Sequence, residues 1–192
     1  MSYINENIKD CLIHKEGEEE VRIVENFFSE DILSKIVHYF DDIGWKCQCG
    51  KDPNVSNNSG DQPYWRIELE KEEFFSIYLR DIIEKWFGKE MELNRIYVVG
   101  QTFGQNSLFH IDDENKNTYT FCFYINTDEE INEDGLFYLK IPYKKYIITI
   151  EPLINRMVIF PSSYKHKGCG FNKGNDNLRI CIAWKFKIKN VK

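Results

Sequence analysis

The sequence predicts a mainly β fold, an antiparallel sandwich or barrel with two α-helices on its outside. After residue 93, short stretches rich in β-branched and aromatic residues recur about every ten residues, separated by Gly, Asn, Asp or Pro. Before residue 93, two stretches carry apolar residues at helical spacing. The chain has 192 residues, of which 42% are hydrophobic, so it can bury a sizeable core. We expect one domain spanning residues 1–192.

The first 93 residues are expected to form a supporting N-terminal region. Residues 1–20 are polar and acidic, which predicts a frayed or loosely attached segment. Residues 21–29, VRIVENFFS, are typical of a short strand followed by a turn. Residues 46–63 are rich in turn formers and poor in apolar residues, so we expect a long loop there. A loop of this length either has a function, such as covering a site, or is disordered.

Two helices are predicted in this region, over residues 31–42 and 71–87. In the first, apolar residues share one helical face, and Ser29 is the expected N-cap. In the second, an aromatic and aliphatic stripe is expected to be core, and Gly88 supplies the C-cap. The two stripes consist of Ile32, Leu33, Ile36, Val37 and Phe40, and of Phe74, Phe75, Tyr78, Leu79, Ile82, Ile83 and Trp86.

Residues 94–192 are expected to form the β core. Between its apolar stretches lie turn-forming residues and no helical pattern, which favours antiparallel strands joined by short connections. The predicted strands lie at residues 94–100, 107–112, 117–126, 135–142, 145–151, 156–161 and 178–189.

The net charge of −6 is unevenly distributed along the chain. Residues 1–96 carry 12 Lys and Arg against 21 Asp and Glu, which is −9, and residues 97–192 carry 13 against 10, which is +3. The overall acidity disfavours a general nucleic-acid binder. No apolar run approaches the roughly 20 residues of a membrane span, and the polar N-terminus matches neither a signal peptide nor a transit peptide. We therefore expect an intracellular, cytoplasmic protein.

Six cysteines are present, and free thiols are the default in an intracellular chain of this size. Cys47 and Cys49 resemble half of a zinc site, but no second pair of ligands follows at a suitable spacing. We therefore expect the cysteines to be structural or incidental.

A histidine and a carboxylate lie two residues apart in LFHIDD, residues 108–113. Residues two apart on a strand point to the same face, so His110 and Asp112 would project together. The β region holds one further histidine, His166, and Arg179 opens the last predicted strand. Two histidines and one carboxylate leave open positions on a six-coordinate ion, which is the facial arrangement of non-haem Fe(II) oxygenases.

The order His110-x-Asp112, His166 and Arg179 resembles that of the Fe(II)/2-oxoglutarate dioxygenases, on the prolyl 4-hydroxylase-like side of that superfamily. Arg179 follows His166 by 13 residues, a longer spacing than is usual in the family, and the turn FNKGNDN is expected to absorb the difference. The resemblance covers about residues 94–187. Further stretches that resemble the family are YVVGQTFGQNSLFHIDD, TFCFYIN, EDGLFYL and MVIFPSSYKH.

This resemblance implies a double-stranded β-helix, the cupin-like jelly roll, over residues 94–192. It also implies that His110, Asp112 and His166 bind Fe(II). Asp113 lies one residue out of phase with Asp112, so it is expected to face solvent or to form a turn.

The resemblance further implies the co-substrates and the reaction. Arg179 suits the far carboxylate of 2-oxoglutarate, because its planar guanidinium binds a carboxylate through two nitrogens and stays charged. Tyr124 and Tyr97 are expected to add co-substrate contacts. Such enzymes use O₂ to decarboxylate 2-oxoglutarate to succinate and to hydroxylate a substrate, with ascorbate as a supporting reductant. The expected substrate is a peptidyl residue such as proline, or a small molecule.

Two alternatives stay open. The same scaffold could bind a metal without turnover, because fold does not fix function. A nucleic-acid oxidative demethylase would use the same chemistry, and the +3 charge of the second half leaves room for it. However, no interleaving of aromatic and basic residues in the sequence marks a strand-binding groove. The loops at residues 46–63 and 101–107 are expected to set the substrate.

Overall fold

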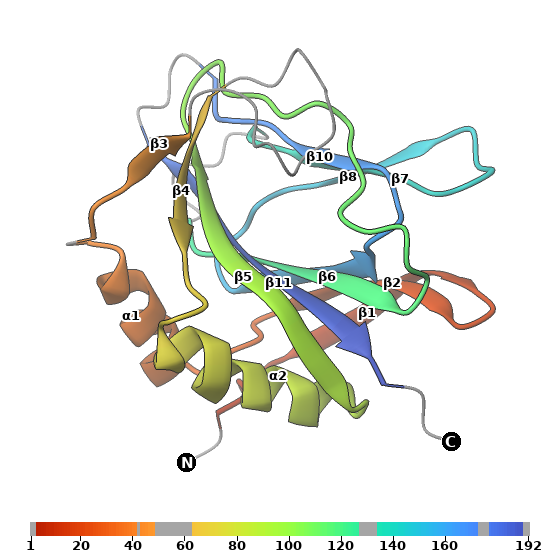
Figure 1. Cartoon of the computed structure of the whole chain (residues 1–192), viewed down its shortest axis with the longest axis horizontal. Helices are drawn as coiled ribbons and strands as arrows, with labels where there is room; N and C mark the ends of the chain where they lie inside the picture. Colours follow the sequence, from red (N-terminus) through yellow and green to blue (C-terminus); the bar gives the residue numbers. More distant parts are fainter. Residues whose placement is uncertain (1–2, 42, 49–62, 127–133, 173–176, 190–192) are drawn as a thin grey trace.

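Two antiparallel sheets dominate the structure, a computed structural model that describes residues 3–41, 43–48, 63–126, 134–172 and 177–189 (Figure 1). The larger sheet has the strand order β1-β2-β9-β6-β11-β5-β4-β3, and the smaller sheet has the order β10-β7-β8. Together they form the predicted double-stranded β-helix, or jelly roll, with helices on its outside.

The strand bounds show that the larger sheet draws on the whole length of the chain. It contains β1 (Lys9–Glu16), β2 (Glu19–Glu25), β3 (Lys46–Gln48), β4 (Tyr64–Glu68), β5 (Met91–Gln101), β6 (Thr118–Tyr124), β9 (Arg156–Pro161) and β11 (Arg179–Ile188). The smaller sheet contains β7 (Phe137–Lys140), β8 (Ile147–Ile150) and β10 (His166–Gly168).

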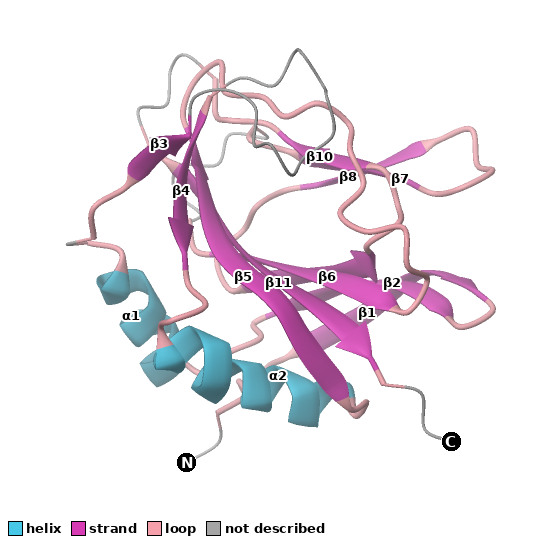
Figure 2. Ribbon diagram, in the orientation of Figure 1, coloured by secondary structure: helices cyan, strands magenta, loops and turns pink. Residues whose placement is uncertain are grey.

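Two helical segments cover the outer face of the larger sheet (Figure 2). The first is α1 (Glu30–Tyr39); the second begins as a π-helical segment, η1 (Phe74–Leu79), and continues as α2 (Arg80–Phe87). Gly88 ends α2 in the left-handed conformation at φ 71°, as predicted. Ser29 takes the N-cap position of α1, but its side chain makes no capping hydrogen bond. Both predicted helices are therefore confirmed.

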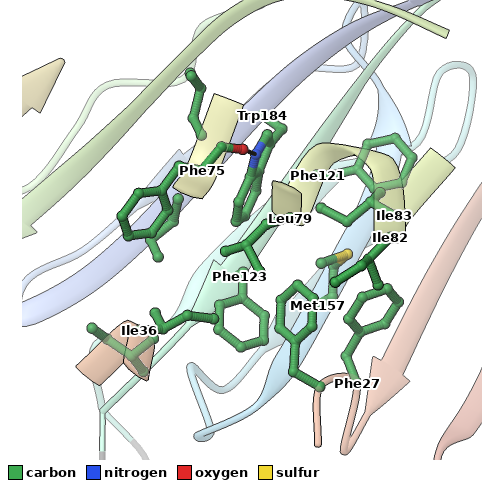
Figure 3. Packing of buried hydrophobic residues seen from close by; sticks show 14 of the residues in the cluster. Phe27, Ile36, Phe75, Leu79, Ile82, Ile83, Phe121, Phe123, Met157 and Trp184 are labelled. Atoms are coloured by element: carbon green, nitrogen blue, oxygen red, sulfur yellow. Dashed lines mark hydrogen bonds between the residues drawn. The ribbon is translucent and has the colours of Figure 1, made fainter. Parts of the chain in front are cut away.

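The helices bury a cluster of aromatic and aliphatic side chains against the larger sheet (Figure 3). Trp184 on β11 is fully buried in this cluster, and its indole Nε1 donates a hydrogen bond to the Phe75 carbonyl at 3.1 Å. This bond satisfies the only polar atom of a large buried ring and connects η1 to the sheet.

Strand β6 is buried on both faces along its whole length. Phe121 and Phe123 point into the helix-covered core, whereas Cys122 and Tyr124 belong to a second cluster that includes residues of both sheets. A strand with one solvated face would alternate apolar and polar residues. The run TYTFCFY lacks that alternation because each of its faces packs against protein.

The prediction of a frayed segment over residues 1–20 is wrong for most of its length. Strand β1 pairs with β2 along a hairpin, and Gly17, at φ 59°, lies in the turn. Because β1 is at the edge of the larger sheet, nearly all its side chains are exposed. Backbone hydrogen bonds hold this strand, and its side chains therefore carry no apolar alternation that a sequence reading could detect.

The predicted strand at residues 107–112 is also wrong. This segment forms one isolated bridge, between His110 and His166, and belongs to no named strand. The backbone N–H groups of Asp112 and Asp113 both point to the Ser162 carbonyl, so the segment curves away from a regular ladder. Strand β10, which contains His166, was not predicted.

The long loop predicted over residues 46–63 is wrong at its start, where Lys46–Gln48 forms β3 and pairs with β4. Residues 49–62 of that prediction lie outside the described residues, and residue 63 is in no strand or helix. Strand β4 was not predicted either. Within the described part of the chain, Cys11, Cys122, Cys169 and Cys181 are free thiols.

Among the described residues, no helix combines the length and the apolar character needed to cross a membrane. The single-domain organisation over residues 1–192 stays a prediction.

Asn155 links the connection between β8 and β9 to the segment between β2 and α1, and its replacement is expected to destabilise the fold. Its side chain accepts a hydrogen bond from Phe28 N and donates one to Phe28 O, both at 2.8 Å, and its backbone has φ 59°. Asn155→Ala leaves two buried backbone groups unpaired at a backbone conformation that alanine disfavours. We expect a loss of about 2–4 kcal/mol in the free energy of unfolding.

Denaturant unfolding would measure this loss, with the exposed Asn94→Ala as the matched control. An equal, small effect in both variants would contradict the prediction.

Candidate metal and co-substrate site

Three potential metal ligands converge at one end of the space between the sheets. His110 and Asp112 lie in the connection between β5 and β6, and His166 is the first residue of β10. Their ligand atoms all lie within 4.8 Å of one another. The distance from His110 Nε2 to Asp112 Oδ1 is 3.7 Å, and the distance from His166 Nε2 to Asp112 Oδ2 is 3.5 Å.

Backbone hydrogen bonds bring the three ligands together. His110 and His166 exchange two backbone bonds, of 3.0 and 2.9 Å, and Asp112 N donates to the Ser162 carbonyl at 2.9 Å. This pairing takes the place of the predicted strand. It achieves the same result, because the side chains of His110 and Asp112 still project to one side.

Each histidine is oriented through its other ring nitrogen. His110 Nδ1 lies 2.9 Å from the Leu108 carbonyl, and His166 Nδ1 lies 2.9 Å from the Tyr164 carbonyl. A carbonyl can only accept, so Nδ1 carries a proton and Nε2 is the ring atom that faces Asp112. Metal-binding histidines in proteins use the same arrangement.

Burial and charge act in opposite directions on Asp112, whose side chain is 4% exposed. Burial alone would raise the pKa of this carboxyl group. The positive charges that His166, Lys185 and His110 can carry outweigh burial and hold the pKa of Asp112 well below its usual range. Burial lowers the pKa of His166 to about 4, so this imidazole is uncharged at neutral pH. Asp112 and His166 therefore have the ionisation states that metal binding requires.

Two residues that were not predicted hold the Asp112 carboxylate. Lys185 Nζ lies 2.6 Å from Oδ1, and Thr120 Oγ1 donates to Oδ2 at 2.7 Å. Thr120 is itself within 2.9 Å of Ser162 Oγ. The sequence carried one signal for Lys185: it lies six residues after Arg179 and therefore shares a strand face with it.

The inward side chains of β6 and β11 form a surface that we call the site floor. It runs from the Asp112 end, where Lys185 and Thr120 are cross-strand partners, to Arg179 at the start of β11. Between the two ends lie the small side chains of Cys122, Cys181 and Ala183. The site floor consists of Thr120, Cys122, Tyr124, Arg179, Cys181, Ala183 and Lys185.

At the far end of the site floor, Arg179 is a buried cation with spare hydrogen-bonding capacity. Its Nε donates to the Gly135 carbonyl at 2.5 Å and its Nη1 donates to Gln101 Oε1 at 2.9 Å. Within the described part of the chain, Arg179 Nη2 and the buried Tyr124 hydroxyl have no hydrogen-bond partner. The guanidinium carbon lies 5.1 Å from the centre of the Tyr124 ring. Unpaired buried donors of this kind suit a carboxylate.

Gly168 preserves the space around this guanidinium. A Cβ atom at this position would lie 3.0 Å from both Arg179 Nη1 and Gln101 Oε1. Any larger residue would therefore push against the hydrogen-bonded pair that orients Arg179.

Tyr97 lies at the opposite end of the site floor from Arg179. Its backbone pairs with Ala183, and its ring centre lies 5.0 Å from Lys185 Nζ and 4.1 Å from the Arg66 guanidinium carbon. Burial raises its pKa to about 12. The predicted contact of Tyr97 with the co-substrate stays a prediction. Asp113, in contrast, forms a turn as expected, since its Oδ1 accepts a hydrogen bond from Asn115 N at 2.9 Å.

Comparison with known proteins identifies the fold. No family model and no curated protein sequence matches the chain. Solved structures do match: a prolyl hydroxylase from Trichoplax adhaerens in complex with a hypoxia-inducible-factor peptide has a TM-score of 0.67 at 16% identity, covering 87% of this chain and 83% of that one. A prolyl-4-hydroxylase from Pseudomonas putida has a TM-score of 0.63 at 13% identity, covering 90% and 94%.

A third similar structure was solved with ligands. HygX from Streptomyces hygroscopicus, with nickel and 2-oxoglutarate bound, has a TM-score of 0.58 at 10% identity and covers 87% of this chain and 82% of its own. At these identities the comparisons establish the fold. The chain has the prolyl 4-hydroxylase-like fold of the 2-oxoglutarate/Fe(II) oxygenases.

The pairing of Gln101 with Arg179 is expected to contribute to stability. Gln101→Leu removes the acceptor of Arg179 Nη1 and leaves a buried charge with one partner fewer. It also removes the bonds that Gln101 Nε2 donates to the Gln105 and Gly168 carbonyls. We expect a loss of about 2–3 kcal/mol in the free energy of unfolding, measured with a denaturant. In the control, Gln105→Leu removes an acceptor from the backbone N–H of Thr102 and leaves Arg179 untouched, so it should cost less. Equal losses in the two variants would show that the bond to Arg179 contributes no more to the free energy of unfolding than the bond to Thr102.

Proposed function

We propose that this chain is an Fe(II)- and 2-oxoglutarate-dependent dioxygenase, which couples oxidative decarboxylation of 2-oxoglutarate to succinate with hydroxylation of a substrate. The observation that carries the proposal is the distribution of donors along the site floor. His110, Asp112 and His166 converge at one end, and the unpaired donors of Arg179 and Tyr124 lie at the other.

The first end of the site floor suits Fe(II). Two imidazole Nε2 atoms and one ionised carboxylate form a donor set that this ion accepts, and they leave positions for a chelating co-substrate and for O₂. When bound, Fe(II) would supply the activation of O₂ that no side chain provides. The protein's part is to orient the imidazoles through the Leu108 and Tyr164 carbonyls and to hold the carboxylate with Thr120.

The second end suits the far carboxylate of 2-oxoglutarate. Arg179 is 2% exposed and keeps one guanidinium nitrogen free for an acceptor, and Tyr124 adds a hydroxyl. A charged hydrogen bond made away from water is strong and selects for a carboxylate. The small side chains of Cys122, Cys181 and Ala183 between the two ends would accommodate the carbon chain of the co-substrate.

We further propose a peptidyl substrate, with proline as the hydroxylated residue. Two of the similar structures support this choice, since one is a prolyl hydroxylase in complex with a peptide and the other is a prolyl-4-hydroxylase. His110 is the most exposed ligand, at 32%, whereas Asp112 and His166 are at most 7% exposed. The substrate would therefore approach from the His110 side.

Succinate formation tests the reaction. Purified protein supplied with Fe(II), 2-oxoglutarate and ascorbate should form succinate, and Asp112→Ala should reduce the rate more than roughly a hundredfold because it removes the carboxylate ligand. Asp113→Ala is the matched control, since Asp113 caps a turn, and its rate should stay near wild type. Succinate is measured by NMR. The loss of Asp112 as a metal ligand is measured as a weaker affinity of Asp112→Ala for Mn(II).

Absence of Fe(II)-dependent succinate from the wild-type protein would contradict the proposal. Hydroxylation of a proline-containing peptide, detected by mass spectrometry as the gain of one oxygen atom, tests the substrate separately. Binding of metal and 2-oxoglutarate without succinate, even with such peptides present, would instead favour a binding module.

The role of Arg179 is tested through the co-substrate. Arg179→Met should weaken 2-oxoglutarate binding roughly a hundredfold, because the charged hydrogen bonds to its far carboxylate are lost. Binding of Mn(II) alone should change little, because Arg179 is at the opposite end of the site floor. Calorimetry measures both constants, and Arg80→Met on α2, where Arg80 pairs with Asp81, is the control. Unchanged 2-oxoglutarate binding in Arg179→Met would remove Arg179 from the site.

A further inference from the structure

The proposed reaction gives no role to Lys185, the cation at the Asp112 end of the site floor. Its ammonium lies 2.6 Å from Asp112 Oδ1, in an ion pair whose side chains are 15% and 4% exposed. A surface lysine would share its charge with water. This lysine has the carboxylate of a proposed metal ligand as its partner.

The fold gives Lys185 little freedom to leave that position. On one side it is the cross-strand partner of Thr120, which binds the other oxygen of the same carboxylate. On the other side the Tyr97 ring lies against it, with its centre 5.0 Å from Nζ. Because Tyr97 also contacts the guanidinium of Arg66, a second cation borders this end of the site floor.

Charge counting shows what this arrangement means for a metal ion. Asp112 supplies one negative charge, and Lys185 cancels it. The two imidazoles bind a metal ion as neutral ligands, so they add no negative charge to the donor set. A divalent cation would therefore bind to donors with no net negative charge, and it would share the carboxylate with an ammonium that repels it. Without the lysine, the same donors would carry a charge of −1.

We infer that Lys185 competes with the divalent metal ion for Asp112 and sets the affinity of the site for metal. This inference rests on the proposed function, because it requires that the triad of His110, Asp112 and His166 binds a metal ion. Lys185 acts through Asp112 and is a positioning residue in this role. Since 2-oxoglutarate brings two negative charges, the wild-type site should hold metal more tightly when the co-substrate is present.

Metal binding to the whole chain tests this inference, with Mn(II) alone as the probe. Lys185→Met should bind Mn(II) roughly tenfold or more tightly than wild type, because the competing charge is removed. Lys185→Arg, which keeps the charge, should bind no more tightly than wild type. The control is Lys187→Met, on the same strand but exposed, and it should leave the affinity unchanged. Affinity is measured by electron paramagnetic resonance of free Mn(II).

A second measurement separates competition from a structural role. Mn(II) should raise the melting temperature of Lys185→Met by more than that of wild type, because a more tightly bound ion stabilises the folded state further. If Lys185 only supported the fold, Lys185→Met would have a lower melting temperature than wild type, but Mn(II) would raise both melting temperatures by the same amount. Lys185→Gln replaces the methionine variant if near-ultraviolet circular dichroism shows that the latter has not folded.

The outcomes distinguish this inference from the proposed function. If the wild type binds Mn(II) and the neutral variants bind it no more tightly, competition by Lys185 is overturned and the proposed function is unaffected. If neither wild type nor neutral variants bind Mn(II), with or without 2-oxoglutarate, the proposed function fails, and the inference fails with it.

Discussion

One buried carboxylate constrains the whole region between the two sheets. Asp112 is almost fully removed from water, and a buried charge is costly unless cations and hydrogen-bond donors surround it. Its partners come from three different elements: His166 from β10, Lys185 from β11 and Thr120 from β6. The smaller sheet, the larger sheet and the connection that carries Asp112 therefore meet at a single charge, and a shift of any one of them would remove a partner of that charge.

The central strands of the larger sheet serve two purposes at once. On β6, Phe121 and Phe123 pack in the helix-covered core, while Cys122 and Tyr124 are part of the site floor. Because a strand alternates its side chains between faces, the packing of α1, η1 and α2 on one side fixes the position of the site-floor side chains on the other. The helices thus support the site without contributing a residue to it.

Sequence reasoning predicted the fold class, both helices and the convergence of His110, Asp112 and His166, although their metal-binding role stays a prediction. The expected strand at residues 107–112 was wrong, and a single bridge to β10 brings the side chains together instead. Lys185 was not recognised because a lysine on a strand is usually solvated. Strand β1 was missed because an edge strand is held by its backbone, which leaves no pattern in its side chains.

The bridge between His110 and His166 also has a consequence for the order of folding. It joins residues 56 positions apart, with β6, β7, β8 and β9 between them. Closing such a long loop costs entropy, so this contact becomes favourable only once the intervening strands have assembled. A partly folded chain would hold the two imidazoles far apart. Binding of a metal ion by both imidazoles would therefore require the complete native topology. It would also shift the equilibrium from late folding intermediates to the native state.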